Sequence, residues 1–396
     1  MSTSDPIVIV GMARTPIGGF QGVLKDVSGP ELGSSAIRAA LERSGVPAED
    51  IDEVLMGCVL PAGMGQAPAR QASLGAGIPD ATGCTTVNKM CGSGMKTTML
   101  AHDLLVAGTN EVMVAGGLES MSNAPYILPK ARSGQRLGHG QMLDHMFLDG
   151  LEDAFDKGTL MGVFAERTAK KYGFSREAQD KFAIRSLTRA KKAIEDGSFD
   201  AEVTPVTYKN RQGEVTVEQD EQPLKANLDK IPKLRPAFDK DGTVTAANSS
   251  SISDGAAALV MMRESTAKKR GLKPIARFLG HSSFAQEPAW FTTAPVSAII
   301  KLLETVGWKA NDVDLYEINE AFAVVTMAAM KDLDLPAEKV NVHGGACALG
   351  HPVGASGTRI LVTLISALQK YGKTRGVASL CIGGGEATAM AVEVMS

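Results

Sequence analysis

The chain has 396 residues, a formal net charge of −3, and 44% hydrophobic against 21% charged residues. This length predicts two or more domains, the composition excludes a disordered chain, and the charge balance excludes a surface built to neutralise nucleic-acid phosphates. Five cysteines, no long apolar run and a start (MSTSDPIVIV) without signal-peptide features indicate a cytoplasmic protein with free thiols and with neither nucleic acid nor membrane as a partner.

Two stretches of the chain repeat each other. The first, AIRAALERSGVPAEDIDEV, starts at Ala36, and the second, AIIKLLETVGWKANDVDLY, starts at Ala298. Alanine, glycine and two aspartates match at a constant offset. Each stretch predicts an amphipathic helix, a glycine that ends it, a capped turn and a strand. The chain is therefore expected to contain one structural unit twice.

Further matching pairs follow in the same order. A glycine-rich turn opens a helix at residues 92–94 and again at 355–357, and VMVAGGLES (from Val112) is similar to SLCIGGGEA (from Ser379). In the second copy GGGEATAMAVEV continues directly as a strand, whereas in the first copy the comparable strand starts only at Ser253. The segment between is expected to run over the surface and cover a site. The alternation of strands and helices predicts an α/β fold with a mostly parallel sheet.

Cys91 stands directly before a predicted helix in NKMCGSGMKTTMLAHDLLVAG. We expect Ser93 to be its N-cap and Gly108 to end it. A thiol at a helix N-terminus lies at the positive end of the dipole, which lowers its pKa. Cys91 is thus a candidate nucleophile; the alternative is a small buried apolar side chain.

The stretch VNVHGGACALGHPVGASGTRI carries His343, Cys347 and His351. Their spacing would suit metal ligands on a helix, but the surrounding glycines and Pro352 break any such helix. We interpret His351 as a turn residue before the helix that begins near Ala355, where the positive helix end favours a neutral imidazole that can act as a base. The alternative is a structural turn histidine, and that is how we interpret His343.

Two further positions could carry chemistry. Asn319 lies between a strand (LYEIN) and a helix, where a polar side chain is often only a cap. Cys381 ends the strand ASLCI and precedes Gly383, Gly384 and Gly385. Backbone N–H groups of such a glycine run can form an oxyanion hole, although a simple chain bend would look the same.

NKMCGSG, NEAF, GGACALGHPVGASG and CIGGGEA, in this order and spacing, resemble the motifs of the thiolases over essentially the whole chain, most closely those of the acetyl-CoA C-acetyltransferase kind. The resemblance implies a five-layered α-β-α-β-α arrangement of two duplicated domains with an inserted loop domain. The expected bounds are 1–120 with 248–270 for the N-terminal domain, 121–247 for the loop domain and 271–396 for the C-terminal domain.

The resemblance also implies a role for each candidate. Cys91 takes the acyl group as a thioester and His351 activates its thiol. Cys381 removes the α-proton of the second acetyl-CoA. Asn319 holds a water that, with His351, stabilises the enolate oxygen, and the N–H groups of Cys91 and Gly383 bind the acyl-enzyme carbonyl. The implied reaction is the reversible Claisen condensation of two acetyl-CoA to acetoacetyl-CoA and CoA by a ping-pong mechanism.

Coenzyme A thioesters are the implied substrates, with no permanently bound cofactor, and a homotetramer is the implied assembly. The implied CoA contacts are Leu151, Met161, Phe238, Ala246, Ser250, Ala321 and Phe322.

Four positions depart from common family patterns. Leu160 replaces a histidine, and a bulky Phe291 beside Met161 is expected to shorten the acyl pocket. Phe182 replaces a tyrosine that serves potassium in some members, so no required metal is expected. His343 replaces a common asparagine.

Three other functions compete with this interpretation. One is a degradative 3-oxoacyl-CoA thiolase that accepts longer acyl chains. Another is a thiolase-like carrier without turnover, which would be expected to lack the catalytic Cys or His that this chain retains. The third is a Rossmann dehydrogenase, but no G-x-G-x-x-G stands between an early strand and a helix.

Overall fold

The computed structural model describes residues 5–395. Residues 1–4 and 396, which the predicted domain bounds include, lie outside the described residues. The first half holds β1 (Ile7–Arg14), β2 (Gly18–Gly19), α1 (Gly29–Ser44), β3 (Glu53–Gly57), α2 (Pro68–Gly75), β4 (Gly83–Val87), α3 (Ser93–Ala107) and β5 (Val112–Ser120). The inserted segment holds β6 (Tyr126–Ile127), β7 (Leu143–Asp144), η4 (Phe147–Leu151), α4 (Met161–Tyr172), α5 (Arg176–Glu195), β8 (Val206–Asn210), β9 (Gly213–Val217) and α6 (Glu221–Lys225). The rest holds β10 (Ser253–Arg263), α7 (Glu264–Lys269), β11 (Ala276–Ala285), η6 (Pro288–Thr293), α8 (Ala294–Val306), β12 (Leu315–Ile318), α9 (Ala323–Asp332), α10 (Ala346–Leu349), α11 (Ser356–Lys370), β13 (Arg375–Ile382) and β14 (Glu386–Val394).

The predicted internal repeat is confirmed by the order of strands. The first half runs β1-β10-β5-β3-β4, and the second half runs β11-β14-β13-β12 in the corresponding order. The two sets meet where β1 and β11 pair over two positions, Val8 with Arg277 and Ile9 with Ala276. The strand from Ser253, which the repeat matched to the C-terminal strand, is β10 and lies beside β5.

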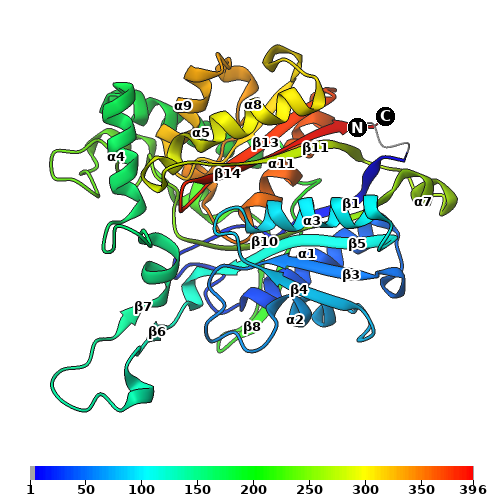
Figure 1. Ribbon diagram of the computed structural model, residues 1–396, viewed down its shortest axis with the longest axis horizontal. Helices are drawn as coiled ribbons and strands as arrows, with labels where there is room; N and C mark the ends of the chain where they lie inside the picture. The colour runs from blue at the N-terminus through cyan, green and yellow to red at the C-terminus, as the bar shows by residue number, and fades with distance from the viewer. Residues whose placement is uncertain (1–4, 396) are drawn as a thin grey trace.

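The elements form five layers, in agreement with the expected fold class (Figure 1). Helices α1 and α2 cover the outer face of the first set of strands, and α8 covers the outer face of the second set, next to α9. Helices α3 and α11 lie between the two sets and share one apolar core with both. Because α11 is surrounded by protein, every residue from Ser356 to Leu368 is buried, unlike a surface helix with one apolar face.

The expectation of a mostly parallel sheet is wrong. Strand β3 is parallel to β4 and β5, and β12 is parallel to β13, but β1–β10, β10–β5, β11–β14 and β13–β14 are antiparallel. The three glycines after Ile382 join β13 to β14 by a tight turn, and such a turn can only connect antiparallel neighbours. The sheet is therefore mixed, with its parallel part at the outer edges.

The inserted segment is anchored to the first strand through a buried charge network. Arg14 of β1 is fully buried; its Nε donates to Glu202 at 2.5 Å and its Nη atoms donate to Asp220 at 2.7 and 2.9 Å. The guanidinium also lies over the ring of Phe199, 4.8 Å from its centroid. The arm that carries β6 and β7 projects from the body of the molecule (Figure 1). Within residues 5–395 no helix has the length and apolar character needed to cross a membrane.

We predict that Arg14→Met lowers the free energy of unfolding by about 3–5 kcal/mol, because it leaves two buried carboxylates without their cation. Urea denaturation measures this loss. Arg270→Met, which removes the surface ion pair with Asp50, is the matched control and should cost under about 1 kcal/mol. Equal losses in the two variants would contradict the anchoring role of Arg14.

Candidate active site

A cavity of about 560 Å³ lies where turns of both halves meet the inserted segment. Cys91, His351 and Gly383, from three distant parts of the chain, line it. The structure also brings all the implied CoA contacts to its wall: Leu151, Met161, Phe238, Ala246, Ser250, Ala321 and Phe322. Asn319 and Cys381 are buried behind this surface. Residues from all four sequence motifs thus meet at one place, although their roles stay predictions.

The turn that carries Cys91 is closed by side chains on either side of it. Asn88 Oδ1 accepts from the N–H of Met90 at 2.9 Å, and Met90 has a φ of 48°. The Ser93 hydroxyl accepts from the N–H of Lys89 at 2.9 Å and donates to the carbonyl of Met90 at 2.6 Å. The N-cap prediction for Ser93 is therefore wrong: Gly92 holds that position, and Ser93 closes the turn. The end of α3 at Gly108 is confirmed, with a φ of 76°.

A missing side chain lets this turn approach the second half of the chain. A Cβ on Gly92 would lie 2.4 Å from Cδ1 of Ile382, closer than two carbon atoms can pack. An ion pair between Lys89 and Glu386 also joins this turn to the start of β14. Glycine at position 92 thus allows Cys91 to lie beside the end of β13, which holds Cys381, and the β13–β14 turn, which holds Gly383.

Burial controls the ionisation of both thiols. Although Cys91 keeps some surface open to the cavity, burial raises its pKa to about 11, while N–H groups of Gly383 and Cys91 itself act in the opposite direction. The expectation that the helix dipole gives Cys91 a lowered pKa is therefore wrong. Burial also raises the pKa of Cys381, and a charge on Cys91 would raise it further.

His351 is held as one neutral tautomer. Burial, together with the nearby Arg359 cation, lowers its pKa to about 3. The Ser356 hydroxyl donates to the carbonyl of Pro352 at 3.0 Å, so it accepts at 2.5 Å from an Nδ1–H of His351. This network assigns the proton to Nδ1 and leaves the lone pair on Nε2. The expectation of a neutral imidazole is confirmed, with burial as the larger cause.

The Nε2 lone pair of His351 faces the amide of Asn319. Asn319 follows β12, and its Nδ2 lies 3.5 Å from Nε2 of His351. Its Oδ1 accepts from Nη2 of Arg359 at 3.3 Å, and Arg359 is itself paired with Glu317 at 3.5 Å. Arg359 therefore turns the donor end of the amide toward His351. Sequence reasoning missed Arg359 and Ser356; the signal was an arginine inside the otherwise apolar run of α11.

A third residue that sequence reasoning missed is Glu119, near the end of β5. Its carboxylate accepts from the N–H groups of Val59 at 2.8 Å, Leu60 at 3.1 Å and Gly354 at 2.9 Å. Burial raises its pKa to about 7, while these three donors lower it. Glu119 thus joins a loop of the first half to the loop that carries His351. The matching glutamate in GGLES and GGGEA was the available signal.

His343 and Cys347, which share a sequence stretch with His351, lie outside the catalytic cavity. His343 is buried, with its ring edge-on to Phe199 at 5.7 Å and tilted against Tyr371 at 5.5 Å. It does not line the cavity, in agreement with a structural role. The Cys347 thiol donates to the carbonyl of Glu320 at 3.6 Å.

One end of the cavity is closed by bulky apolar side chains. Phe291 is 2% exposed and packs edge-on against Phe164, with ring centroids 6.2 Å apart. Leu160 and Met161 line the same cavity. An isolated bridge joins Ser249 to Phe322, and the Ser250 hydroxyl donates to the carbonyl of Ala321 at 3.0 Å.

Comparisons with known proteins agree with this geometry. A family model described as the thiolase N-terminal domain matches residues 7–265, and one described as the thiolase C-terminal domain matches residues 272–394. An acetyl-CoA acetyltransferase of Escherichia coli K12 is 51% identical over 389 residues, covering 98% of each chain, and one of Thiocystis violacea is 48% identical over 98% of this chain and 99% of its own. A crystal structure of the Bacillus anthracis acetyl-CoA acetyltransferase has a TM-score of 0.96 at 43% identity and covers 100% of both chains.

We predict that iodoacetamide alkylates Cys91 at a rate that rises about tenfold per pH unit from neutrality toward its pKa. The thiolate is the nucleophile, and a pKa of about 11 leaves the thiol protonated at pH 7, so raising the pH raises the reactive fraction. Mass spectrometry of the labelled peptide measures the rate, with Cys91→Ser as the control for assignment. A rate that levels off near neutral pH would contradict the raised pKa.

Proposed function

The chain belongs to the thiolase family, and from this premise we propose that it is an acetyl-CoA C-acetyltransferase, which condenses two acetyl-CoA to acetoacetyl-CoA and CoA and also runs in reverse. Its substrates are thioesters of coenzyme A. The observation that carries the proposal is that Cys91, His351 and Gly383 line the same cavity as all seven candidate CoA contacts. This shared lining supports the assignment of a nucleophile, a base and a substrate wall that act on one thioester carbon.

The first half-reaction moves an acetyl group onto Cys91. Because burial keeps both the thiol and the imidazole neutral at rest, the thiol proton passes to Nε2 of His351 as the sulfur attacks the acetyl carbonyl. The tetrahedral intermediate collapses with loss of the CoA sulfur, which takes the proton of Cys381. The products are acetyl-Cys91, free CoA and a Cys381 thiolate.

The second half-reaction forms the new carbon–carbon bond. The Cys381 thiolate removes a proton from the methyl group of a second acetyl-CoA, and the resulting enolate carbon attacks the acetyl-Cys91 carbonyl. The carbon–sulfur bond to Cys91 then breaks, and the departing sulfur recovers its proton from His351. Each group returns to its starting state, so the cycle needs no other reactant.

Two sets of donors stabilise the oxygens that become negative. The N–H groups of Cys91 and Gly383 both act to lower the pKa of the Cys91 thiol, which supports their assignment as donors to the oxygen of the acyl group carried there. On the other side, we assign the enolate oxygen to His351 and to a water held by Asn319, whose donor end Arg359 turns inward. The charge thus develops beside fixed dipoles rather than in bulk water.

The cavity wall suits a short acyl chain attached to the long, mostly apolar pantetheine part of coenzyme A. We assign Phe291 and Met161 to the wall around the acyl group. We assign the segments that Ser250 and Ala321 join to the wall along the pantetheine chain. Neither step above uses a metal ion.

Assembly and location follow from features outside the cavity. The β6–β7 arm exposes Leu137 by 98%, Met142 by 65% and Tyr126 by 60%, and exposed apolar side chains grouped in this way are typical of protein contacts. We therefore propose a homotetramer with the arm at its contacts. All five cysteines are free thiols, which supports a reducing, cytoplasmic location.

The two cysteines should be separable by half-reaction. We predict that Cys91→Ala abolishes both acetyl-enzyme formation and condensation, whereas Cys381→Ala blocks condensation by at least about 10³-fold but keeps measurable acetylation of Cys91. Radiolabelled acetyl-CoA with protein mass spectrometry follows acetylation, and absorbance of acetoacetyl-CoA follows condensation. Cys84→Ala, on the edge strand β4, is the control. Full activity of Cys91→Ala would overturn the proposed function.

Acyl-chain length distinguishes the proposal from a broad degradative thiolase. We predict that thiolysis of acetoacetyl-CoA exceeds that of 3-oxohexanoyl-CoA at least about tenfold in kcat/KM, because two more methylenes meet Phe291. Phe291→Ala should lower the ratio of kcat/KM for acetoacetyl-CoA to that for 3-oxohexanoyl-CoA. Phe284→Ala, in a different core cluster, should leave this ratio unchanged. Comparable rates for both substrates in the unaltered protein would favour the degradative alternative.

A further inference from the structure

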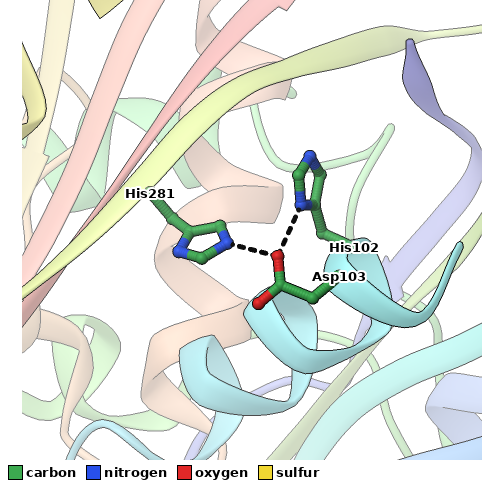
Figure 2. A group of neighbouring side chains, drawn as sticks. All are labelled: His102, Asp103 and His281. Atoms are coloured by element: carbon green, nitrogen blue, oxygen red, sulfur yellow. Dashed lines mark hydrogen bonds and ion pairs between the residues drawn. The ribbon is translucent and has the colours of Figure 1, made fainter. Parts of the chain in front are cut away.

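A cluster of two histidines and one aspartate lies outside the catalytic cavity. His102 and Asp103 are neighbours on α3, and His281 lies on β11, so the cluster joins the two halves of the chain (Figure 2). None of the three lines the cavity. Along α3, His102 is nine residues from the first helical residue, about 14 Å at 1.5 Å per residue. The proposed reaction therefore gives these side chains no task.

Both imidazoles point at the same carboxylate oxygen. Oδ1 of Asp103 lies 3.1 Å from Nδ1 of His102 and 2.8 Å from Nε2 of His281. The three atoms lie within 4.8 Å of one another. In a tetrahedral zinc site with bonds of about 2.0–2.1 Å, ligand atoms stand about 3.3 Å apart. The cluster already approximates three corners of such a site.

The surroundings hold the two rings while leaving the carboxylate accessible. The rings of His102 and His281 pack edge-on at 5.3 Å, and His102 packs edge-on to Phe278 of β11 at 6.2 Å. The side chains of His102 and His281 are 17% and 21% exposed, whereas that of Asp103 is 54% exposed. An ion can therefore enter from the solvent side of Asp103, where water can complete its coordination.

We propose that His102, Asp103 and His281 form a binding site for one divalent transition-metal ion, with zinc as the best match. Two imidazoles and one carboxylate favour zinc and its neighbours over calcium or magnesium, which prefer oxygen ligands. The ion ties α3, the helix that follows Cys91, to β11 of the second half. Its role is structural, and the condensation proceeds without it.

Cobalt is the probe for the binding test, because its visible spectrum reports its ligands. The metal-free protein should bind one Co²⁺ with a nitrogen–oxygen spectrum, and zinc should displace it. His102→Ala, His281→Ala and Asp103→Asn should each weaken binding at least about tenfold. His139→Ala, an exposed histidine in the inserted segment, is the matched control and should bind as tightly as the unaltered protein.

Thermal unfolding supplies the second readout. Zinc should raise the Tm of the unaltered protein and of His139→Ala, but not that of His281→Ala, since only a ligand that binds the folded state stabilises it. Thiolysis activity without added metal should be the same in all of these variants, which also verifies their folding. Absence of saturable Co²⁺ binding would overturn the proposal. So would a sulfur-to-cobalt charge-transfer band with affinity unchanged in the histidine variants, because the ion would then occupy the cysteines.

Discussion

The candidate active site depends on one close contact between the two halves of the chain. The loop that carries His351 crosses the first half so tightly that a Cβ on Gly117 would lie 2.1 Å from the carbonyl oxygen of Gly354. No other residue type leaves room for two backbones at this distance. The same crossing brings the N–H of Gly354 to the carboxylate of Glu119. This close approach of the two backbones determines the position of the His351 imidazole. It also affects the shape of the cavity and the contact of α3 with α11.

Burial at this contact determines the electrostatics of the proposed chemistry. Desolvation raises the pKa of Cys91 and lowers that of His351, so both members of the resting pair are uncharged. A charged pair would need compensation at a buried site, whereas a neutral pair does not. What the protein supplies instead is orientation: Ser356 sets the tautomer of His351, and Arg359 sets the direction of the Asn319 amide. The fixed dipoles are in place before any charge develops.

The sequence predicted the repeat, the five layers and the neutral His351, because these follow from local periodicity and from motifs that resemble a known family. Strand direction was mispredicted, since it depends on which distant strand fills each gap; β10 reaches β5 only after the long insertion. The Ser93 and Cys91 expectations failed for two different reasons. The Ser93 hydroxyl bonds within the preceding turn instead of capping α3, whereas the pKa of Cys91 is raised by tertiary burial, which rules for helix starts do not include. Arg359 and Glu119 act through partners far away in the chain, which no local pattern reveals.

The central pair of helices has a consequence for how such a site can arise. Helices α3 and α11 occupy equivalent positions in the repeat, and their first turns touch: the Thr358 hydroxyl donates to the carbonyl of Gly94 at 2.8 Å. A symmetric assembly of identical halves would present the same residue from both turns. Joining the halves in one polypeptide removes that symmetry. One copy can then keep a sulfur before its helix while the other keeps a nitrogen, so that duplication followed by divergence yields two complementary reactive groups facing a shared space.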